Sequence, residues 1–186
     1  MKKTVLTFGL IGGVMISILM LANVSFVKQI GFDKAELVGY TAIVVSFLMV
    51  FFGIRSYRDN VGNGYITFGR AFAVGALITL ITSICYVITW EVVYFNLMPN
   101  FLTDYANYLV EKMRAEGATQ QAIDAKLQEM VDFKQLYDNP FLNPLITLIE
   151  PVPVGLLITF ISSLVLRRKK GDSSPTHEPT QRMVAW

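Results

Sequence analysis

Residues 70–91 read RAFAVGALITLITSICYVITWE, and this stretch decides the fold class. It holds 20 residues without a charged side chain between Arg70 and Glu91. A helix needs about 20 apolar residues to cross the hydrocarbon core of a bilayer. The stretch therefore predicts a transmembrane helix, and not a core helix of a water-soluble domain.

Three further apolar runs have the same character. Residues 4–27 form an uncharged run of 24 residues, residues 37–54 form one of 18, and the run Pro151–Leu166 extends backwards past Glu150 to Phe141. The first run exceeds the roughly 7–15 apolar residues of a signal peptide, so we expect it to remain as a span. The predicted spans are residues 4–27, 37–54, 68–95 and 143–166.

The composition favours a single membrane domain. Of the 186 residues, 53% are hydrophobic and 16% are charged, which departs from the usage of soluble domains. We assign residues 1–170 to this domain. Residues 171–186 are rich in Ser, Pro and Thr, and we predict a disordered cytoplasmic tail there.

Basic residues gather on one side of the predicted spans. Near the span ends, the side of the N-terminus carries nine basic residues, whereas the short loop at residues 28–36 on the other side carries two. The long loop at residues 94–143 has four basic and seven acidic residues. Because Lys and Arg near span ends favour the cytoplasm, we expect both termini inside and both of these loops outside.

Small side chains recur at every fourth residue on two of the predicted spans. Helices in lipid associate through such rows, because small side chains let two backbones approach closely. We interpret the rows as packing faces between spans of one chain, and a face between two copies of the chain is the alternative. The residues are Gly9, Gly13 and Ser17 on the first span and Ala71, Gly75, Thr79 and Ser83 on the third.

Glu91 and Glu150 are the acidic residues at the edges of the predicted spans. An unpaired ionisable group is costly to bury in a membrane, so both are candidate functional residues. Pro151 and Pro153 follow Glu150 and predict a kink or an interrupted helix. If the span begins at Pro151 instead, Glu150 is an acid near the positive end of the helix dipole. The two interpretations are a proton- or cation-binding pair and a structural carboxylate.

The loop between the third and fourth spans predicts two short amphipathic helices at about residues 100–138. Apolar residues recur there at the helical spacing of three and four. Gly117 predicts the end of the first helix, and Thr119 predicts the N-cap of the second. The two apolar stripes can pack against each other, on the membrane surface or on a partner. The predicted contact surface consists of Tyr105, Leu109, Met113, Ile123, Leu127 and Met130.

These features together resemble a known family. A glycine-rich first span precedes GYITFGRAF at residues 64–72, and EGATQQAI follows the third span at residues 116–123. Asn139-Pro140-Phe141 then leads into a last span that closes with Arg167-Arg168-Lys169. The pattern is similar to the domain of unknown function 4199 family of small bacterial four-helix membrane proteins, over roughly residues 1–170. The resemblance implies a bacterial inner-membrane setting and an outward-facing loop, but no chemistry.

The sequence offers no residue set for metal or acid–base chemistry. His177 is the only histidine and Cys85 the only cysteine, so we expect no metal site, no cofactor and no intramolecular disulfide. The four basic residues 167–170 directly follow a span. We interpret them as its cytoplasmic anchor and expect no nucleic-acid partner.

We therefore predict an all-α integral membrane protein, a four-helix bundle with an extracytoplasmic amphipathic helical hairpin between spans three and four. The predicted function is non-catalytic: protein–protein interaction through the hairpin, as an accessory subunit or assembly factor, and not an enzyme. The alternative is a small oligomeric transporter or channel that uses Glu91 and Glu150. The expected partners are the lipid bilayer and either a membrane protein or further copies of the chain.

Overall fold

The computed structural model describes residues 1–168, apart from the side chains of residues 26, 28 and 29. Within this range the chain is all-α and forms no strand, which confirms the predicted fold class. The elements are α1 (Lys2–Ile30), α2 (Phe32–Asn60), α3 (Phe68–Val92), the π-helix η1 (Val93–Leu97), α4 (Phe101–Ala115), α5 (Gln120–Tyr137), α6 (Leu142–Thr147) and α7 (Pro151–Leu166). The predicted tail at residues 171–186 lies outside the described residues.

Four helical segments of the described chain are long and apolar enough to cross a membrane. They are Lys2–Ser25, Phe32–Asn60, Phe68–Leu97 and Leu142–Leu166, with 24, 29, 30 and 25 residues. A helix rises about 1.5 Å per residue, so each segment matches or exceeds the roughly 30 Å of a hydrocarbon core. The four predicted spans are confirmed at this level, and the chain has the build of a multi-pass membrane protein.

The connection between α1 and α2 differs from the expected loop at residues 28–36. Helix α1 continues to Ile30 and α2 begins at Phe32, so Gly31 alone connects them. Gly31 has a φ of 79°, which a residue without a Cβ adopts at little cost. The expectation of a loop here was wrong because charged residues at the helix ends interrupt the apolar run without ending the helix.

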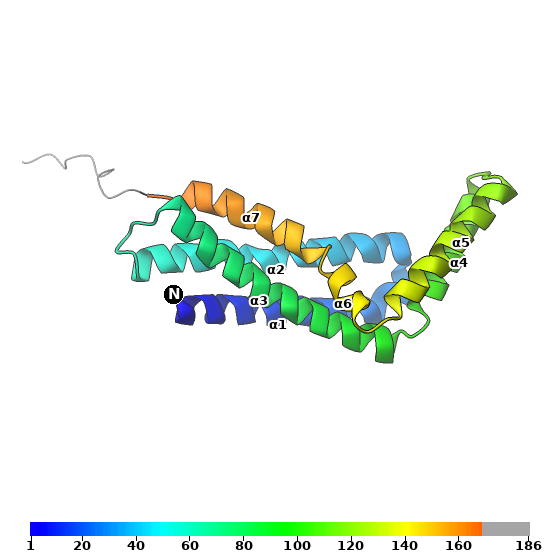
Figure 1. Cartoon of the computed structure of the whole chain (residues 1–186), viewed down its shortest axis with the longest axis horizontal. Coiled ribbons are helices and arrows are strands. Elements are labelled where there is room, and N and C mark those ends of the chain that lie inside the picture. The colour runs from blue at the N-terminus through cyan, green and yellow to red at the C-terminus, as the bar shows by residue number, and fades with distance from the viewer. Residues whose placement is uncertain (169–186) are drawn as a thin grey trace, which may run out of the picture.

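Helices α2 and α3 pack against each other, and each also packs against α1 and α7 (Figure 1). The middle of the bundle is filled with side chains at most 1% exposed, among them Phe47, Val50, Ile54, Val74 and Ile78. Many apolar side chains on the outer faces are exposed, such as Ile18 at 61% and Ile88 at 60%. An apolar exterior around a filled interior is the pattern expected of helices surrounded by lipid.

The small-residue rows lie in interfaces inside this chain. A Cβ on Gly9 would come within 2.8 Å of Ile81, and one on Gly13 within 2.5 Å of the Cys85 sulfur, so this row packs against α3. Ser17 Oγ lies 2.7 Å from Thr89 Oγ1 and continues the same seam.

The row on α3 packs against α7. A Cβ on Gly75 would lie 2.7 Å from Thr159 Cγ2, and Thr79 Oγ1 is 3.1 Å from Thr159 Oγ1. Ala71 and Ser83 on the same row are fully buried. Both rows are therefore occupied by neighbours from the same chain, which leaves no open small-residue face along them for a second copy.

The bundle has two distinct ends, visible at the left and right of Figure 1. One carries the N-terminus, the α2–α3 connection and the end of α7, where Ile66 and Arg168 exchange backbone hydrogen bonds of 3.1 and 2.9 Å. We call it the basic end, because the basic residues Lys2, Lys3, Arg55, Arg58, Arg70, Arg167 and Arg168 belong to it. The other is the hairpin end, formed by the α1–α2 turn, η1, α4, α5 and α6.

The fourth span is interrupted at the predicted place. Helix α6 ends at Thr147 and α7 starts at Pro151, with turns between them. Pro151 has no backbone N–H and fits the first position of a new helix, with Glu150 at its N-cap. The prediction of an interrupted helix is confirmed, whereas the alternative that the span begins at Pro151 is wrong, because the span-capable segment starts at Leu142.

Candidate functional site

Helices α4 and α5 form a hairpin that projects from the end of the bundle (Figure 1). Helix α4 ends at Ala115, and Gly117 follows with a φ of 78°. The Thr119 hydroxyl accepts a hydrogen bond of 3.3 Å from the Ala122 backbone N–H and caps α5. The predicted roles of Gly117 and Thr119 are confirmed.

The predicted contact surface of the hairpin is largely covered within the described chain. Ile123 is 2% exposed, Leu127 is 36% exposed, and the other four residues of the set are half-buried. Leu127 is joined on the outside of α5 by Val131, which is 50% exposed. Together with Phe133 at 36% and Leu136 at 52%, they form the apolar part of α5 that the rest of the described chain leaves open.

A chain of hydrogen bonds fixes the base of the hairpin to the spans. Trp90 Nε1 donates to the Tyr137 hydroxyl at 2.7 Å, and that hydroxyl lies 2.8 Å from Thr147 Oγ1. Thr147 donates in turn to Asn143 Oδ1 at 3.0 Å, while Asn143 Nδ2 donates to the Tyr137 carbonyl at 3.0 Å. Thr147 has one proton and gives it to Asn143, so Tyr137 must donate to Thr147. The chain therefore runs in one direction from α3 through α5 to α6.

A second polar contact lies beside it. The Tyr94 hydroxyl donates to Asp138 Oδ1 at 2.6 Å, and Lys134 donates to the other carboxylate oxygen. Burial disfavours the ionised form, but the hydrogen bonds from Lys134 and Tyr94 outweigh it and hold the pKa of Asp138 below its usual value. The carboxylate thus stays ionised and connects η1 to the end of α5.

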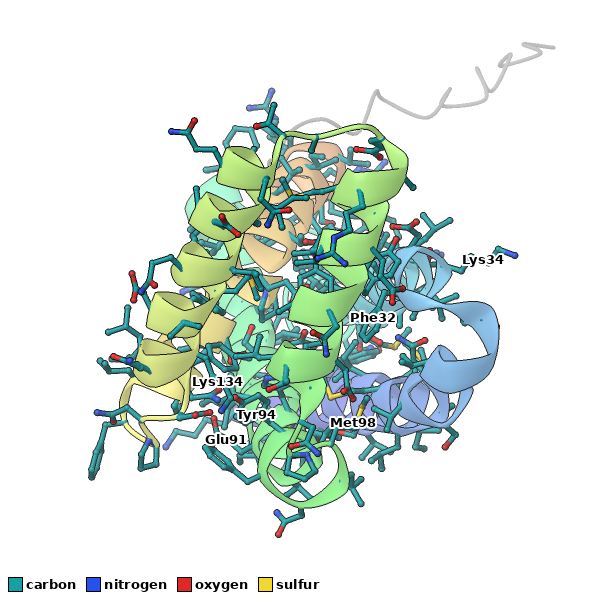
Figure 2. The ribbon with its side chains drawn as sticks, turned by 90° about the vertical axis from the view of Figure 1, so that its right-hand side faces the viewer. Phe32, Lys34, Glu91, Tyr94, Met98 and Lys134 are labelled. Carbon is teal, nitrogen blue, oxygen red and sulfur yellow. The ribbon has the colours of Figure 1, made fainter. Side chains whose placement is uncertain are left out.

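Aromatic side chains attach α4 to the start of α2. The Phe32 ring lies 6.0, 5.5 and 5.2 Å from the rings of Phe101, Tyr105 and Tyr108, measured between centroids. Lys112 Nζ lies 3.1 Å from Asp33 Oδ1 in an exposed ion pair, and its hydrogen bond to Asp33 raises the pKa of Lys112. Figure 2, which views the molecule from this end, shows Phe32 beside α4 and Lys34 pointing outward.

The two candidate acids have different surroundings. Glu150 accepts a hydrogen bond of 2.5 Å from the buried Tyr86 hydroxyl, although the Glu150 side chain as a whole is exposed. Glu91 is half-buried on α3, and its Oε1 is buried without a hydrogen-bond partner among the described residues. The hydrogen bonds of the described chain do not join the two acids, so each has to be considered separately.

A cavity of about 580 Å³ lies between the hairpin and the spans. Helices α4, α5 and α6 contribute walls, as do the second half of α1, the first half of α2 and the end of α3. Most of its lining is apolar, including Ile16, Met20 and Val24. Glu150 lines it, as do Tyr105 and Met130 of the predicted contact surface, whereas Glu91 does not. The sequence-based account did not predict this cavity.

Sequence reasoning missed most of the residues at this site. From the sequence, Trp90, Tyr94 and Tyr86 are expected only as aromatic residues near a membrane surface, which gives no sign of their hydrogen bonds. Asn143 and Thr147 lie one helical turn apart and follow Tyr137 closely in the sequence. This spacing was the available sequence signal for a buried polar network. The contacts of Phe32 with the aromatic rings of α4 gave no signal in the sequence, because Phe32 lies about 70 residues before them.

No group of three or more His, Cys, Asp and Glu side chains in residues 1–168 is arranged to hold a metal ion. The site has instead the features of a recognition site, namely an apolar cavity and a carboxylate held by a tyrosine. Its walls are helices, so no movable segment is needed to form it. Pockets of this kind are typical of small-molecule and lipid-binding sites.

The fold and site define the class: an all-α protein with four span-capable helices and a helical hairpin at one end. The model of the family described as "Protein of unknown function (DUF4199)" matches residues 7–168, and the chain belongs to this family. The resemblance noted from the sequence is thereby confirmed. No curated protein and no solved structure matches the chain.

Proposed function

We propose that the protein resides in the bacterial inner membrane with both termini in the cytoplasm and the hairpin outside. The distribution of basic residues supports this orientation, because the basic end holds most of the Lys and Arg near the span ends. The hairpin end is acidic overall, with seven acidic and four basic residues between 94 and 143.

In this orientation the protein acts without catalysis, as an accessory subunit or assembly factor that binds another membrane protein through its hairpin. The observation that carries the proposal is the open outer part of the hairpin. Beyond the contacts of Lys112 and the hairpin base, α4 and α5 pack mainly on each other, and Leu127 and Val131 stay exposed on α5. Exposed apolar side chains within a polar rim are common where proteins bind partners.

A photo-crosslinking amino acid at Val131 tests this function in intact cells. We expect a discrete adduct with another protein, since Val131 lies at the centre of the proposed contact. The matched control places the same probe at Thr103, an exposed residue near the base of α4. Leu127→Ser should weaken the Val131 adduct while leaving membrane insertion unchanged. Equal adducts from both positions, or none from Val131, would contradict the proposal.

The second candidate is an oligomeric transporter or channel that uses Glu91 and Glu150. Glu91 Oε1 is buried without a partner among the described residues, and this favours the second candidate. Burying such a group in a membrane is costly, so an acid that is kept there is a candidate functional residue. Against it stands the filled bundle interior, where Phe47, Val50 and Ile78 are at most 1% exposed and leave no path between the two ends of one chain. A pathway would therefore have to run between copies.

Oligomeric state separates the two candidates. The interaction role predicts that the purified chain alone is no oligomer of fixed size, and that Glu91→Gln leaves the Val131 adduct intact. A stable homo-oligomer, together with cation flux in vesicles that Glu91→Gln and Glu150→Gln abolish, would favour transport instead.

A further inference from the structure

The cavity at the hairpin end has the size of a ligand site. Its volume of about 580 Å³ falls within the roughly 300–1,000 Å³ of small-molecule pockets. It reaches from Met20 and Val24 on α1 across to Met130 on α5, so its walls come from elements far apart in the sequence. Fixed helices and the hydrogen bonds at the hairpin base form these walls before any ligand arrives.

Aromatic rings supply much of the wall beside the apolar chains. Tyr40, Trp90, Phe101 and Tyr105 all line the cavity. The face of an aromatic ring carries negative charge density and attracts cations such as ammonium groups, most strongly when water is excluded. The lining thus suits a molecule that combines an apolar body with a positive charge.

The charged groups on the wall have one sign. Glu36, Glu129 and Glu150 line the cavity, and the described lining residues include no Lys, Arg or His. Glu150 has one oxygen held by the Tyr86 hydroxyl, and its exposed side chain leaves the carboxylate open to a further donor. Glu129 is paired with Lys126, whose Nζ lies 2.8 Å from Glu129 Oε1, so Glu36 and Glu150 are the wall carboxylates without an ion pair among the described side chains. These two carboxylates repel fatty acids and phosphates and attract a cation.

One residue of the wall, Asn23, has an unsatisfied acceptor. Asn23 Nδ2 donates to the Ala35 carbonyl at 2.9 Å, and a carbonyl can only accept, so the amide orientation is fixed with Oδ1 away from Ala35. That Oδ1 is buried and has no hydrogen-bond partner among the described residues. A buried acceptor without a donor is unfavourable, so this part of the wall is polar and incompletely satisfied.

We propose that this cavity binds a free lipophilic amine, with its ammonium group hydrogen-bonded to Glu150 and its apolar body between α1, Trp90 and Met130. A free amine fits better than the ammonium headgroup of a phospholipid, since the phosphate beside that ammonium would face the carboxylates of Glu36 and Glu150. The site is distinct from the outer face of α5 at Leu127 and Val131, and it does not depend on a partner there.

Quenching of Trp90 fluorescence tests the site directly, because Trp90 is part of its wall. The chain has two tryptophans, so Trp186→Phe leaves Trp90 as the only one. The full chain is placed in phosphatidylglycerol nanodiscs and titrated with 12-bromododecylamine, whose bromine quenches tryptophan. We expect saturable quenching, at least about tenfold tighter than with 12-bromododecanol and with no saturable quenching by 12-bromododecanoic acid.

Two variants locate the binding. Glu150→Gln should weaken amine binding about tenfold and reduce the preference over the alcohol, whereas Glu116→Gln in the hairpin turn should change nothing. Gly39 lines the cavity, and a Cβ there would meet only Asn23 Nδ2, at 3.6 Å. Gly39→Leu should therefore fill the cavity and remove saturable quenching, even if Glu150→Gln fails to fold.

Three results would overturn the proposal. The first is equal binding of the acid and the amine, and the second is linear quenching that reports partition into lipid only. The third is competition by added phosphatidylethanolamine, which would assign the site to a lipid headgroup instead of a free amine.

Discussion

At the scale of single residues, the hairpin end is held by a few polar side chains with assigned roles. Tyr137 is the central one, because its hydroxyl both accepts from Trp90 and donates to Thr147. Burial raises the pKa of Tyr137, so the proton needed for this donation is retained. Removing one member of such a network leaves the others buried without partners, which costs more than a surface hydrogen bond.

Tyr137→Phe should lower the free energy of unfolding by about 1–3 kcal/mol, because Trp90 Nε1 and Thr147 each lose a partner. Thermal unfolding of the detergent-solubilised chain, followed by circular dichroism, measures the effect. Tyr65→Phe in the α2–α3 connection is the matched control, since no hydrogen bond of its hydroxyl occurs among the described residues. Equal effects of the two substitutions would contradict the assigned network.

Asp138 should make the hairpin base sensitive to acid. Its pKa is lowered in the fold, so its contribution to stability is complete above the usual carboxyl pKa and is lost as the pH falls through the folded value. The carboxylate is 44% exposed, so the effect is small and local. The protection of the backbone amides around Tyr137 against hydrogen exchange, relative to their intrinsic rates, should fall below about pH 4. Asp138→Asn should remove this pH dependence, and an unchanged profile in that variant would contradict the account.

At the scale of elements, glycine positions decide how closely the helices pack. A Cβ on Gly155 would lie 2.5 Å from Thr79 Cγ2 and 2.6 Å from Phe47 Cε1, so α7 touches α2 and α3 where it has no side chain. Gly69 near the start of α3 has no such neighbour within 4 Å. The two glycines therefore form a matched pair for testing helix packing.

Gly155→Ala should destabilise the bundle by about 1–3 kcal/mol, because α7 must move away from α2 and α3. Gly69→Ala should leave stability unchanged or raise it slightly, since alanine has the higher helix propensity. The melting temperatures of the two variants in the same detergent provide the comparison. A tolerated Gly155→Ala would mean that the α3–α7 seam is looser than described.

The elements were predictable to different degrees. Uncharged runs such as residues 71–90 define the spans, because bilayer thickness sets the length of an apolar helix directly. Gly117 and Thr119 defined the hairpin turn through their local backbone preferences. The continuation of α1 to Ile30 was missed, since charged residues end an apolar run but not the backbone hydrogen bonding. The cavity depends on pairings such as Phe32 with Tyr108, which no local pattern in the sequence records.

At the scale of the whole molecule, one asymmetry connects the fold to the proposed function. The basic end has short connections and backbone hydrogen bonds between Ile66 and Arg168. The hairpin end carries the polar network, the cavity and the hairpin of α4 and α5. A membrane protein of this form presents its recognition features on one side only. The interaction proposed for the hairpin requires that side to face outward.

Thiol accessibility tests this orientation most directly. In a Cys85→Ala background, single cysteines replace Val61 in the α2–α3 connection and Gln121 in the hairpin, both exposed. A membrane-impermeant maleimide is applied to spheroplasts before and after lysis. The account predicts that the cysteine at position 121 is labelled in intact spheroplasts and the one at position 61 only after lysis. Labelling of position 61 before lysis, or protection of position 121 until lysis, would contradict it.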